Sequence, residues 1–331
     1  MVDLNGDGHD DIISGSYWPG TIYVFDGTGK GEYAKGRALT DASGRELNPG
    51  PEWESEDEPQ MQSLASVPFA YDYDADGDFD LISGNIEGGV ILIENVGTAH
   101  APKFSADRVR IQANGADLMV NMGDSGPVVA DWDTDGKPDL IVGAGDGSVT
   151  WFRNTGSRTV PVYAEGVELI DAMPMEGDGS NYMLEPGQQP DRAGTRTKVC
   201  VTDYNRDGLI DLLVGDVRYQ SRPEPDLTDE QIELRDRLQA RLDELNAAIG
   251  ALYEAEAAKA NAEGNVNAPI RIEPDDERVA DLYGEMGELS DQLAPLQAGM
   301  DIHGWVWYYQ RKPADNDVSP KTAQVGMGAG G

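Results

Sequence analysis

The sequence predicts an all-β fold, a β-propeller of about four four-stranded blades with an inserted antiparallel α-helical coiled-coil hairpin. Three observations predict it. An acidic nine-residue motif occurs four times, each copy is followed by short apolar runs of strand length, and one of the four units is interrupted by a long stretch with helical periodicity. Glycine is frequent, at 40 of 331 residues, as expected for a chain with many tight turns.

The four motif copies share the pattern Asp-x-Asx-x-Asp-Gly-x-x-Asp. They read DLNGDGHDD, DYDADGDFD, DWDTDGKPD and DYNRDGLID, and they begin at Asp3, Asp72, Asp131 and Asp203. The copies lie roughly 60 to 70 residues apart, which is too long for a solenoid repeat and suits one four-stranded propeller blade with its loops. Each copy therefore belongs to one repeating unit.

Each motif is followed by two runs that are typical of buried strands, because both of their faces are largely apolar. The first runs are IISG, LISG, LIVG and LLVG, and the second are GTIYVF, GGVILI, GSVTWF and GWVWYY. Further strands are expected at residues 32–39, 103–111 and 162–170, and strands that lead into the next motif at 68–71, 127–130 and 198–201. Each unit therefore has about four strands.

The fourth unit is interrupted between its first two strands by a segment with helical periodicity. Thr228 and Gln231 have the spacing of a capping box, and apolar residues follow at intervals of three or four through 234–252 and again through 279–296. The first helix is expected to run from about Asp229 to Ala262, a length of roughly 50 Å. Two helices with matching narrow apolar stripes predict an antiparallel coiled-coil hairpin that projects from the body of the protein.

The expected domain organisation has four parts, which are propeller blades over 1–225, a helical hairpin over 226–300, completion of the last blade over 301–313 and a flexible tail over 314–331. The apolar stripes of the hairpin either only hold its two helices together or also serve partner binding or self-association. Long loops at 41–66, with the acidic stretch 52–58, and at 171–197 are either solvated connectors or further binding segments.

The motif has the oxygen pattern of a calcium loop. Side-chain oxygens at positions 1, 3 and 5, a glycine at position 6 for a sharp turn, a backbone carbonyl at position 7 and a carboxylate at position 9 suit a hard cation. An EF-hand is excluded because position 12 is not glutamate and the flanks are strands, and Mg²⁺ fits less well because it prefers to keep several waters. Turn formation without metal is the remaining alternative. We expect about four Ca²⁺ ions, held by Asp3, Asn5, Asp7, His9, Asp11, Asp72, Asp74, Asp76, Asp78, Asp80, Asp131, Asp133, Asp135, Lys137, Asp139, Asp203, Asn205, Asp207, Leu209 and Asp211.

The motifs and the LISG-like or LIVG-like strands after them resemble the FG-GAP or VCBS repeats, known from the propeller of integrin α-chains and from many secreted bacterial proteins. The resemblance covers residues 1–225 and 302–313 and implies a propeller with calcium in its loops. The helical insertion departs from the common repeat. The strand that should precede the first motif is missing, so we expect an export signal, and further blades, upstream of Met1.

Composition limits the function classes. The chain has 61 acidic and 25 basic residues and a formal charge of −36, which argues against nucleic acid or anionic membranes as partners, and it has no apolar run long enough to span a membrane. The single Cys200 forms no intrachain disulfide and is expected to be buried. The segment GDSGP around Ser125 resembles a serine protease motif, but it lacks one glycine and an accompanying histidine segment.

These features predict a calcium-stabilised, non-catalytic binding or scaffold protein located outside the cell, in the periplasm or on the cell surface, with a protein or glycan partner. The alternative is a polysaccharide lyase or glycoside hydrolase built on a calcium-binding propeller, because so acidic a chain could hide a catalytic pair of carboxylates. Carboxylate counts also predict that the motifs beginning at Asp72 and Asp131 bind calcium more tightly than the two in which asparagine replaces an acid.

Overall fold

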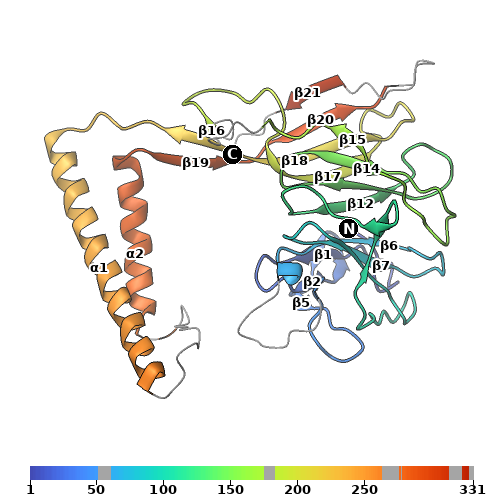
Figure 1. The fold of residues 1–331 in the computed structure, drawn as a ribbon, viewed down its shortest axis with the longest axis horizontal. Coiled ribbons are helices and arrows are strands. Elements are labelled where there is room, and N and C mark those ends of the chain that lie inside the picture. Colours follow the sequence, from blue (N-terminus) through green and yellow to red (C-terminus); the bar gives the residue numbers. More distant parts are fainter. Residues whose placement is uncertain (51–60, 175–182, 263–275, 277, 313–322, 328–331) are drawn as a thin grey trace. The chain divides into compact units, whose positions relative to one another are not determined.

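The computed structural model describes residues 1–50, 61–174, 183–262, 276, 278–312 and 323–327. These residues are mostly β-sheet, with two α-helices (Figure 1). The chain divides into a β unit and a helical unit. The β unit comprises Met1–Tyr182, Gln189–Arg218 and His303–Gly331, and the helical unit comprises Met183–Gln188 and Tyr219–Ile302. The predicted acidic stretch 52–58 and most of the predicted tail 314–331 lie outside the described residues.

Four antiparallel sheets follow one another along the chain in the β unit. The first has the order β1-β2-β5, with β1 Ile12–Gly15, β2 Ile22–Phe25 and β5 Arg37–Ala38. The second has the order β6-β7-β8-β9, with β6 Val67–Tyr71, β7 Asp80–Gly84, β8 Val90–Ile93 and β9 Val109–Arg110. The third has the order β12-β13-β14-β15, with β12 Gly126–Ala130, β13 Asp139–Gly143, β14 Val149–Phe152 and β15 Val167–Ile170.

The fourth sheet has the order β17-β18-β20-β21, with β17 Thr195–Thr202, β18 Asp211–Arg222, β20 Val306–Gln310 and β21 Ala323–Met327. The insertion between β18 and β20 occurs where the sequence predicts it. The predicted tail is wrong over 323–327, because these residues form β21. The outer edge of β20 offers unpaired backbone N–H and C=O groups, and β21 pairs with them in antiparallel register.

Smaller elements connect the main strands. In the first unit, β3 Gly27–Gly29 pairs with β4 Glu32–Tyr33, and in the second, β10 Gln112–Ala113 pairs with β11 Ala116–Asp117. A 3-10 turn, η1, covers Met61–Ser63. The predicted strand at 32–39 is therefore two short strands, β4 and β5, separated by three residues without regular structure.

Alternate residues of each central strand pack on the preceding and the following sheet, because successive side chains of a strand point to opposite faces. In β7, Leu81 joins the core shared with the first sheet, and Ile82 joins the core shared with the third. In β13, Leu140 and Ile141 likewise join the cores shared with the second and fourth sheets. All four side chains are fully buried. Three apolar cores thus join the four sheets in chain order.

The four sheets form a series rather than a closed ring. Among the described residues, no buried apolar cluster joins the fourth sheet to the first. The first sheet also has three main strands instead of four, since β1 pairs with β2 but with no inner strand; only an isolated bridge between Val2 and Asp11 takes that place. The prediction of a mostly β fold is confirmed, and no closed propeller is seen among the described residues.

A repeated contact between adjacent sheets involves the glycine that ends each first strand. A Cβ atom on Gly84 would lie 2.0 Å from the carbonyl oxygen of Ser125, which precedes β12 of the next sheet. The Ser125 hydroxyl accepts a hydrogen bond from Asn85 N at 3.0 Å and donates one to Gly89 O at 2.6 Å. We call this arrangement the glycine–hydroxyl contact. It recurs at the pairs Gly15–Ser66 and Gly143–Thr197, with 1.9 and 2.3 Å to the carbonyl oxygen.

The helical unit contains two antiparallel helices and short strands. Its elements are β16 Met183–Leu184, α1 Asp229–Ala262, α2 Ala280–Leu293, the 3-10 turn η3 Ala294–Leu296 and β19 Gly299–His303, with β16 and β19 pairing with β18. Thr228 N donates to Gln231 Oε1 at 3.0 Å, which confirms the capping box before α1. None of the described helices is long and apolar enough to cross a membrane.

The seam between the helices is apolar, with ion pairs beside it. Leu238, Leu245, Leu289, Leu293 and Leu296 form its buried cluster. Arg241 of α1 pairs with Glu285 of α2, and Glu256, later in α1, pairs with Arg278 just before α2. This opposite sequence order shows that the helices run antiparallel. Because the leucines bury one another, the helical unit has a small core of its own.

Candidate metal sites

The four motifs form short loops at 3–11, 72–80, 131–139 and 203–211, and we name them loops 1 to 4. Loops 2 to 4 each join the inner strand of a sheet to the strand beside it, and loop 1 leads into β1. In loop 1 the Asp3 carboxylate accepts backbone hydrogen bonds from Asp7 at 3.0 Å and Gly8 at 2.9 Å. Asp131 in loop 3 and Asp203 in loop 4 accept the equivalent pairs of bonds. In these three loops the first acid therefore closes the turn onto its own backbone.

The aspartates at position 9 fix each loop to the second strand of its sheet. They are buried, and one oxygen of each accepts the backbone N–H of motif position 2, while the other accepts the N–H of the residue that follows the second strand or lies one residue beyond it. For Asp80 the donors are Tyr73 at 2.9 Å and Asn95 at 2.8 Å. The other three are Asp11, Asp139 and Asp211, which are each 0% exposed. Their main role in this geometry is to position the loop.

Position 7 contributes its backbone in all four loops. The N–H groups of His9, Asp78, Lys137 and Leu209 donate to the position 5 carboxylate at 2.9 to 3.0 Å. These bonds turn the chain back at the glycine of position 6, which has a positive φ in all four loops. The turn that the sequence predicts from this glycine is confirmed.

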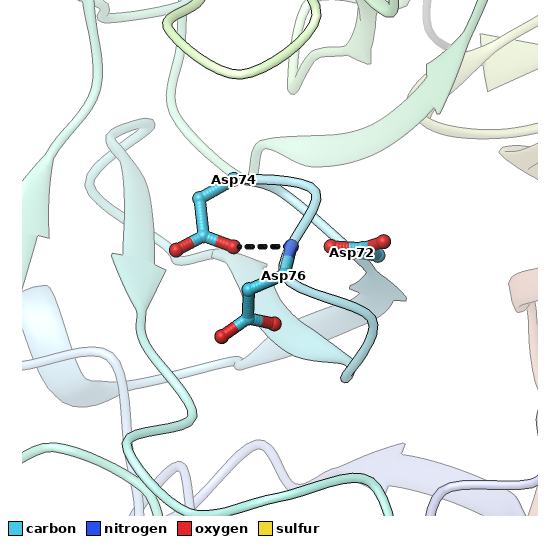
Figure 2. Close-up of side chains that lie close together, drawn as sticks. All are labelled: Asp72, Asp74 and Asp76. Carbon is cyan, nitrogen blue, oxygen red and sulfur yellow. Dashed lines mark hydrogen bonds between the residues drawn. The ribbon is translucent and has the colours of Figure 1, made fainter.

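Loop 2 brings three carboxylates together. Oxygen atoms of Asp72, Asp74 and Asp76 lie within 4.8 Å of one another, and Figure 2 shows the three side chains on the loop. Asp74 Oδ1 accepts the backbone N–H of Asp76 at 3.1 Å. Asp72 Oδ1 is buried and has no hydrogen-bond partner among the described residues. A buried carboxylate oxygen without a partner is costly, and a cation is the group that would satisfy it.

The negative charges of loop 2 repel one another. Burial raises the pKa of Asp78, and the negative charges of Asp76, Asp74 and Asp72 raise it further. Burial also raises the pKa of Asp80 to about 6, against the effect of its two backbone hydrogen bonds. Loop 2 therefore holds concentrated negative charge that a divalent ion would stabilise.

Loop 3 also gathers three carboxylates, those of Asp131, Asp133 and Asp139, but the protein supplies cations to this loop. Arg153 pairs with Asp133 and with Asp135, the latter at 3.2 Å, and Lys137 lies 3.3 Å from Asp135. Desolvation raises the pKa of Asp135, but the hydrogen bonds and charges of Lys137 and Arg153 outweigh it, so its pKa is lowered. The residues of loop 3 fit a metal ion less well than those of loop 2.

Loops 1 and 4 use asparagine at position 3. Asn5 and Asn205 accept the backbone N–H of Asp7 and Asp207, each at 2.9 Å. In loop 4 the Asn205 amide also donates to Asp207 Oδ2 at 2.9 Å, so it occupies a carboxylate oxygen that an ion would need. Among the described residues, these two loops do not gather three acidic side chains as loops 2 and 3 do.

Basic side chains from the next sheet contact loops 1, 2 and 3, which the sequence analysis missed. Arg158 donates to Asp72 O at 2.8 Å and lies over the Tyr71 ring. Arg311 donates to a carbonyl of loop 3 and lies over an aromatic ring there, and the ring of His100 lies against Gly6 of loop 1. A sequence signal exists for two of them, since His100 and Arg158 follow the similar turns NVGT and NTGS.

The candidate nucleophile has a structural role. Ser125 is fully buried, and its hydroxyl forms the glycine–hydroxyl contact between the second and third sheets. Ser66 and Thr197 occupy the equivalent places in the neighbouring interfaces. The likeness of GDSGP to a protease motif is therefore explained by sheet packing. Cys200, expected to be buried, is exposed instead, because it lies on the face of β17 that points away from the third sheet.

Comparison with known families agrees with this repeat geometry. The family model of the FG-GAP-like repeat matches residues 72–142, from the first acid of loop 2 into β13. Residues 72–142 are an FG-GAP-like repeat. The resemblance stated from the motifs is thus confirmed, and the match includes loops 2 and 3. No curated protein matches the chain in sequence.

Solved structures show only distant likeness. A chain of the Photorhabdus luminescens Tc holotoxin pore is 16% identical, with a TM-score of 0.35, over 64% of this chain and 8% of the toxin chain. An Agrocybe aegerita lectin that recognises non-reducing terminal N-acetylglucosamine is 15% identical, with a TM-score of 0.28, over 69% of this chain and 66% of the lectin. Likeness at this level decides neither the fold nor the function.

Proposed function

We propose that the chain is a calcium-binding FG-GAP repeat protein and that loop 2 holds the first ion. The convergence of Asp72, Asp74 and Asp76, with a buried unpartnered oxygen on Asp72, carries this proposal. Ca²⁺ prefers carboxylate and carbonyl oxygens in a flexible loop, and it would offset the repulsion that raises the pKa values of the loop. About four ions remain the expected total, one for each loop.

The loops should differ in affinity. In loop 2 one basic side chain, that of Arg158 from the third sheet, lies 3.5 Å from Asp72 Oδ2, whereas Arg153 and Lys137 form three ion pairs with acids of loop 3. We therefore propose that loop 2 binds more tightly than loop 3, although both have four carboxylates at motif positions 1, 3, 5 and 9. Loops 1 and 4 should bind most weakly, because each has one carboxylate fewer and an asparagine engaged with the backbone.

The protein as a whole is proposed to bind or scaffold without catalysis, outside the cell, where calcium is abundant enough for weak sites. Its four sheets are proposed to be propeller blades, and its two helices a coiled-coil hairpin available to a protein or glycan partner. Binding is favoured over polysaccharide cleavage because the position 9 acids are buried and engaged in backbone hydrogen bonds, so they do not offer a free pair of carboxylates. Cleavage of polysaccharides in calcium, absent in chelator, would instead support a lyase or glycoside hydrolase.

Calcium-dependent melting tests the proposal. An ion present at 100 times its dissociation constant adds about 2.7 kcal/mol to the stability of the folded state, so calcium should raise the melting temperature by several degrees over chelator. Asp74→Asn should remove most of the response to low calcium. Asp107→Asn makes the same charge change at an exposed acid outside the loops and should leave the response intact. Coincident melts of the wild-type protein in calcium and in chelator would overturn the proposal.

A further inference from the structure

The fourth sheet carries a row of side chains that is buried against the next sheet elsewhere in the chain. Residues paired across neighbouring strands point to the same face of a sheet. In the second and third sheets, one such row packs on the following sheet. The rows are Phe69–Ile82–Leu92 in the second sheet, Val128–Ile141–Trp151 in the third and Cys200–Leu213–Tyr308 in the fourth. We call the side of the fourth sheet that bears this row its outer face.

Among the described residues of the β unit, no further sheet packs on the outer face. Val306 is 49% exposed, whereas Val90 and Val149, at the same place in the second and third sheets, are fully buried. Cys200 is exposed as well. Gly215 ends the first strand as Gly84 does, yet the nearest atom to a Cβ placed on it is 3.9 Å away. The outer face thus has the apolar row and the glycine of an inter-sheet contact, with no sheet upon them.

Within the described part of the chain, loop 4 lacks the basic side chain from a following sheet that loops 1, 2 and 3 each have. Basic residues of the following sheet lie against loops 1, 2 and 3, as described for Arg158 and Asp72. Among the described residues, no basic side chain of another sheet contacts loop 4. Two different parts of the repeated interface, the apolar row and the basic contact, therefore end together at the fourth sheet.

The first sheet presents the complementary surface. Ile12, Tyr23 and Phe25 are half-buried and point away from the core that the first sheet shares with the second. Lys30 is exposed in the turn after β2, the place from which Arg158 reaches loop 2 in the third sheet. The first sheet can therefore offer apolar side chains to the outer face and a cation to loop 4.

We propose that the outer face of the fourth sheet docks the first sheet of a second copy of this chain. The contact continues the packing that joins the sheets three times within the chain. Made twice, head to tail, between two copies of the 331-residue chain, it closes eight of the described sheets into a ring, which is within the usual range of about four to eight blades for a propeller. The first sheet brings no hydroxyl to Gly215, so this contact is weaker than the internal ones and the dimer depends on concentration.

Sedimentation equilibrium of the full chain in calcium tests the proposal. The wild-type protein should pass from monomer to dimer with concentration and form no larger species. Val306→Arg should raise the dimer dissociation constant by about tenfold or more, because it places a charge in the centre of an apolar contact. Val167→Arg is the matched control, since Val167 is a strand valine with 48% exposure, and it should leave dimerisation unchanged. Circular dichroism melts show whether each variant is folded.

A mixing experiment tests the head-to-tail geometry. Tyr23→Arg, on the first sheet, should also weaken the dimer, but a copy with Tyr23→Arg and a copy with Val306→Arg together retain one intact pair of surfaces. Their mixture should therefore associate more tightly than either variant alone. A wild-type monomer at every concentration, or a dimer that neither variant weakens, would overturn the proposal. A mixture no tighter than its components would also overturn it, because it would indicate contact between identical faces.

Discussion

Gly84→Ala should destabilise the β unit strongly, because the new Cβ would lie 2.0 Å from Ser125 O, 2.6 Å from its carbonyl carbon and 2.7 Å from its hydroxyl. Ordinary contact begins near 3.4 Å, so the second and third sheets would have to separate locally by about 1 Å. Overpacking of this kind costs about 1–3 kcal/mol, and loss of the hydrogen bond from Asn85 adds about 1 kcal/mol. The expected loss in the free energy of unfolding is about 2–4 kcal/mol.

Gly215→Ala is the internal control, since this glycine has the same place in the fourth sheet but no contact closer than 3.9 Å. The change should be between neutral and about 1 kcal/mol stabilising, as alanine restricts the unfolded chain. Urea unfolding followed by tryptophan fluorescence, in calcium and at dilution that keeps the protein monomeric, measures both variants. Equal costs for the two substitutions would refute the glycine–hydroxyl contact as the cause.

Three further predictions concern the interfaces and the insertion. Ser125→Ala should cost about 1–2 kcal/mol in urea unfolding, because the backbone groups of Asn85 and Gly89 lose their partner; an unchanged midpoint would contradict this. Burial raises the pKa of Asp41, but hydrogen bonds and charge from its turn outweigh it and hold the pKa below 3.8, so its stabilisation is complete above that pH and is lost as the pH falls through the folded value. Asp41→Asn should accordingly lower the free energy of unfolding by about 1–3 kcal/mol at pH 7 and by clearly less at pH 3. An equal loss at both pH values would contradict this prediction. Replacing 226–300 with a Gly-Ser linker should keep calcium-dependent melting of the β unit while removing helical circular dichroism, and failure of the β unit to fold would show that its core needs the insertion.

Much of the fold could be predicted because its signals are local. The runs LISG and LIVG have strand length and apolar composition, and they form β7 and β13. The helix predicted over Asp229–Ala262 is α1, since its capping pair and leucine spacing lie within one segment. The motifs predicted a propeller, yet no closed ring is seen among the described residues, because closure depends on contacts between the first and last sheets that no local pattern specifies.

The positions of the metal loops could be predicted from the sequence, but the differences in charge and hydrogen bonding among the loops could not. A count of the carboxylates at positions 1, 3, 5 and 9 predicts equal calcium affinity for loops 2 and 3. Arg153, which lies 18 residues beyond Asp135, nevertheless neutralises part of the charge of loop 3. The role of Ser125 depends on Asn85, 40 residues earlier, and becomes visible only when two sheets pack. Asp80 resembles a ligand in the motif, but its oxygens accept two backbone hydrogen bonds, one of them from 15 residues away. Such contacts join distant segments, so composition and spacing did not reveal them.

The most direct test of the central claim is the location of the first bound ion. Crystals of the full chain exposed to limiting calcium, or to terbium as a calcium substitute, should show their strongest anomalous peak at loop 2. The peak should lie about 2.3–2.6 Å from oxygens of Asp72, Asp74 and Asp76, and a peak at loop 3 should appear only at higher metal concentration. A strongest peak at loop 3, or no peak at any of the four loops, would contradict the account.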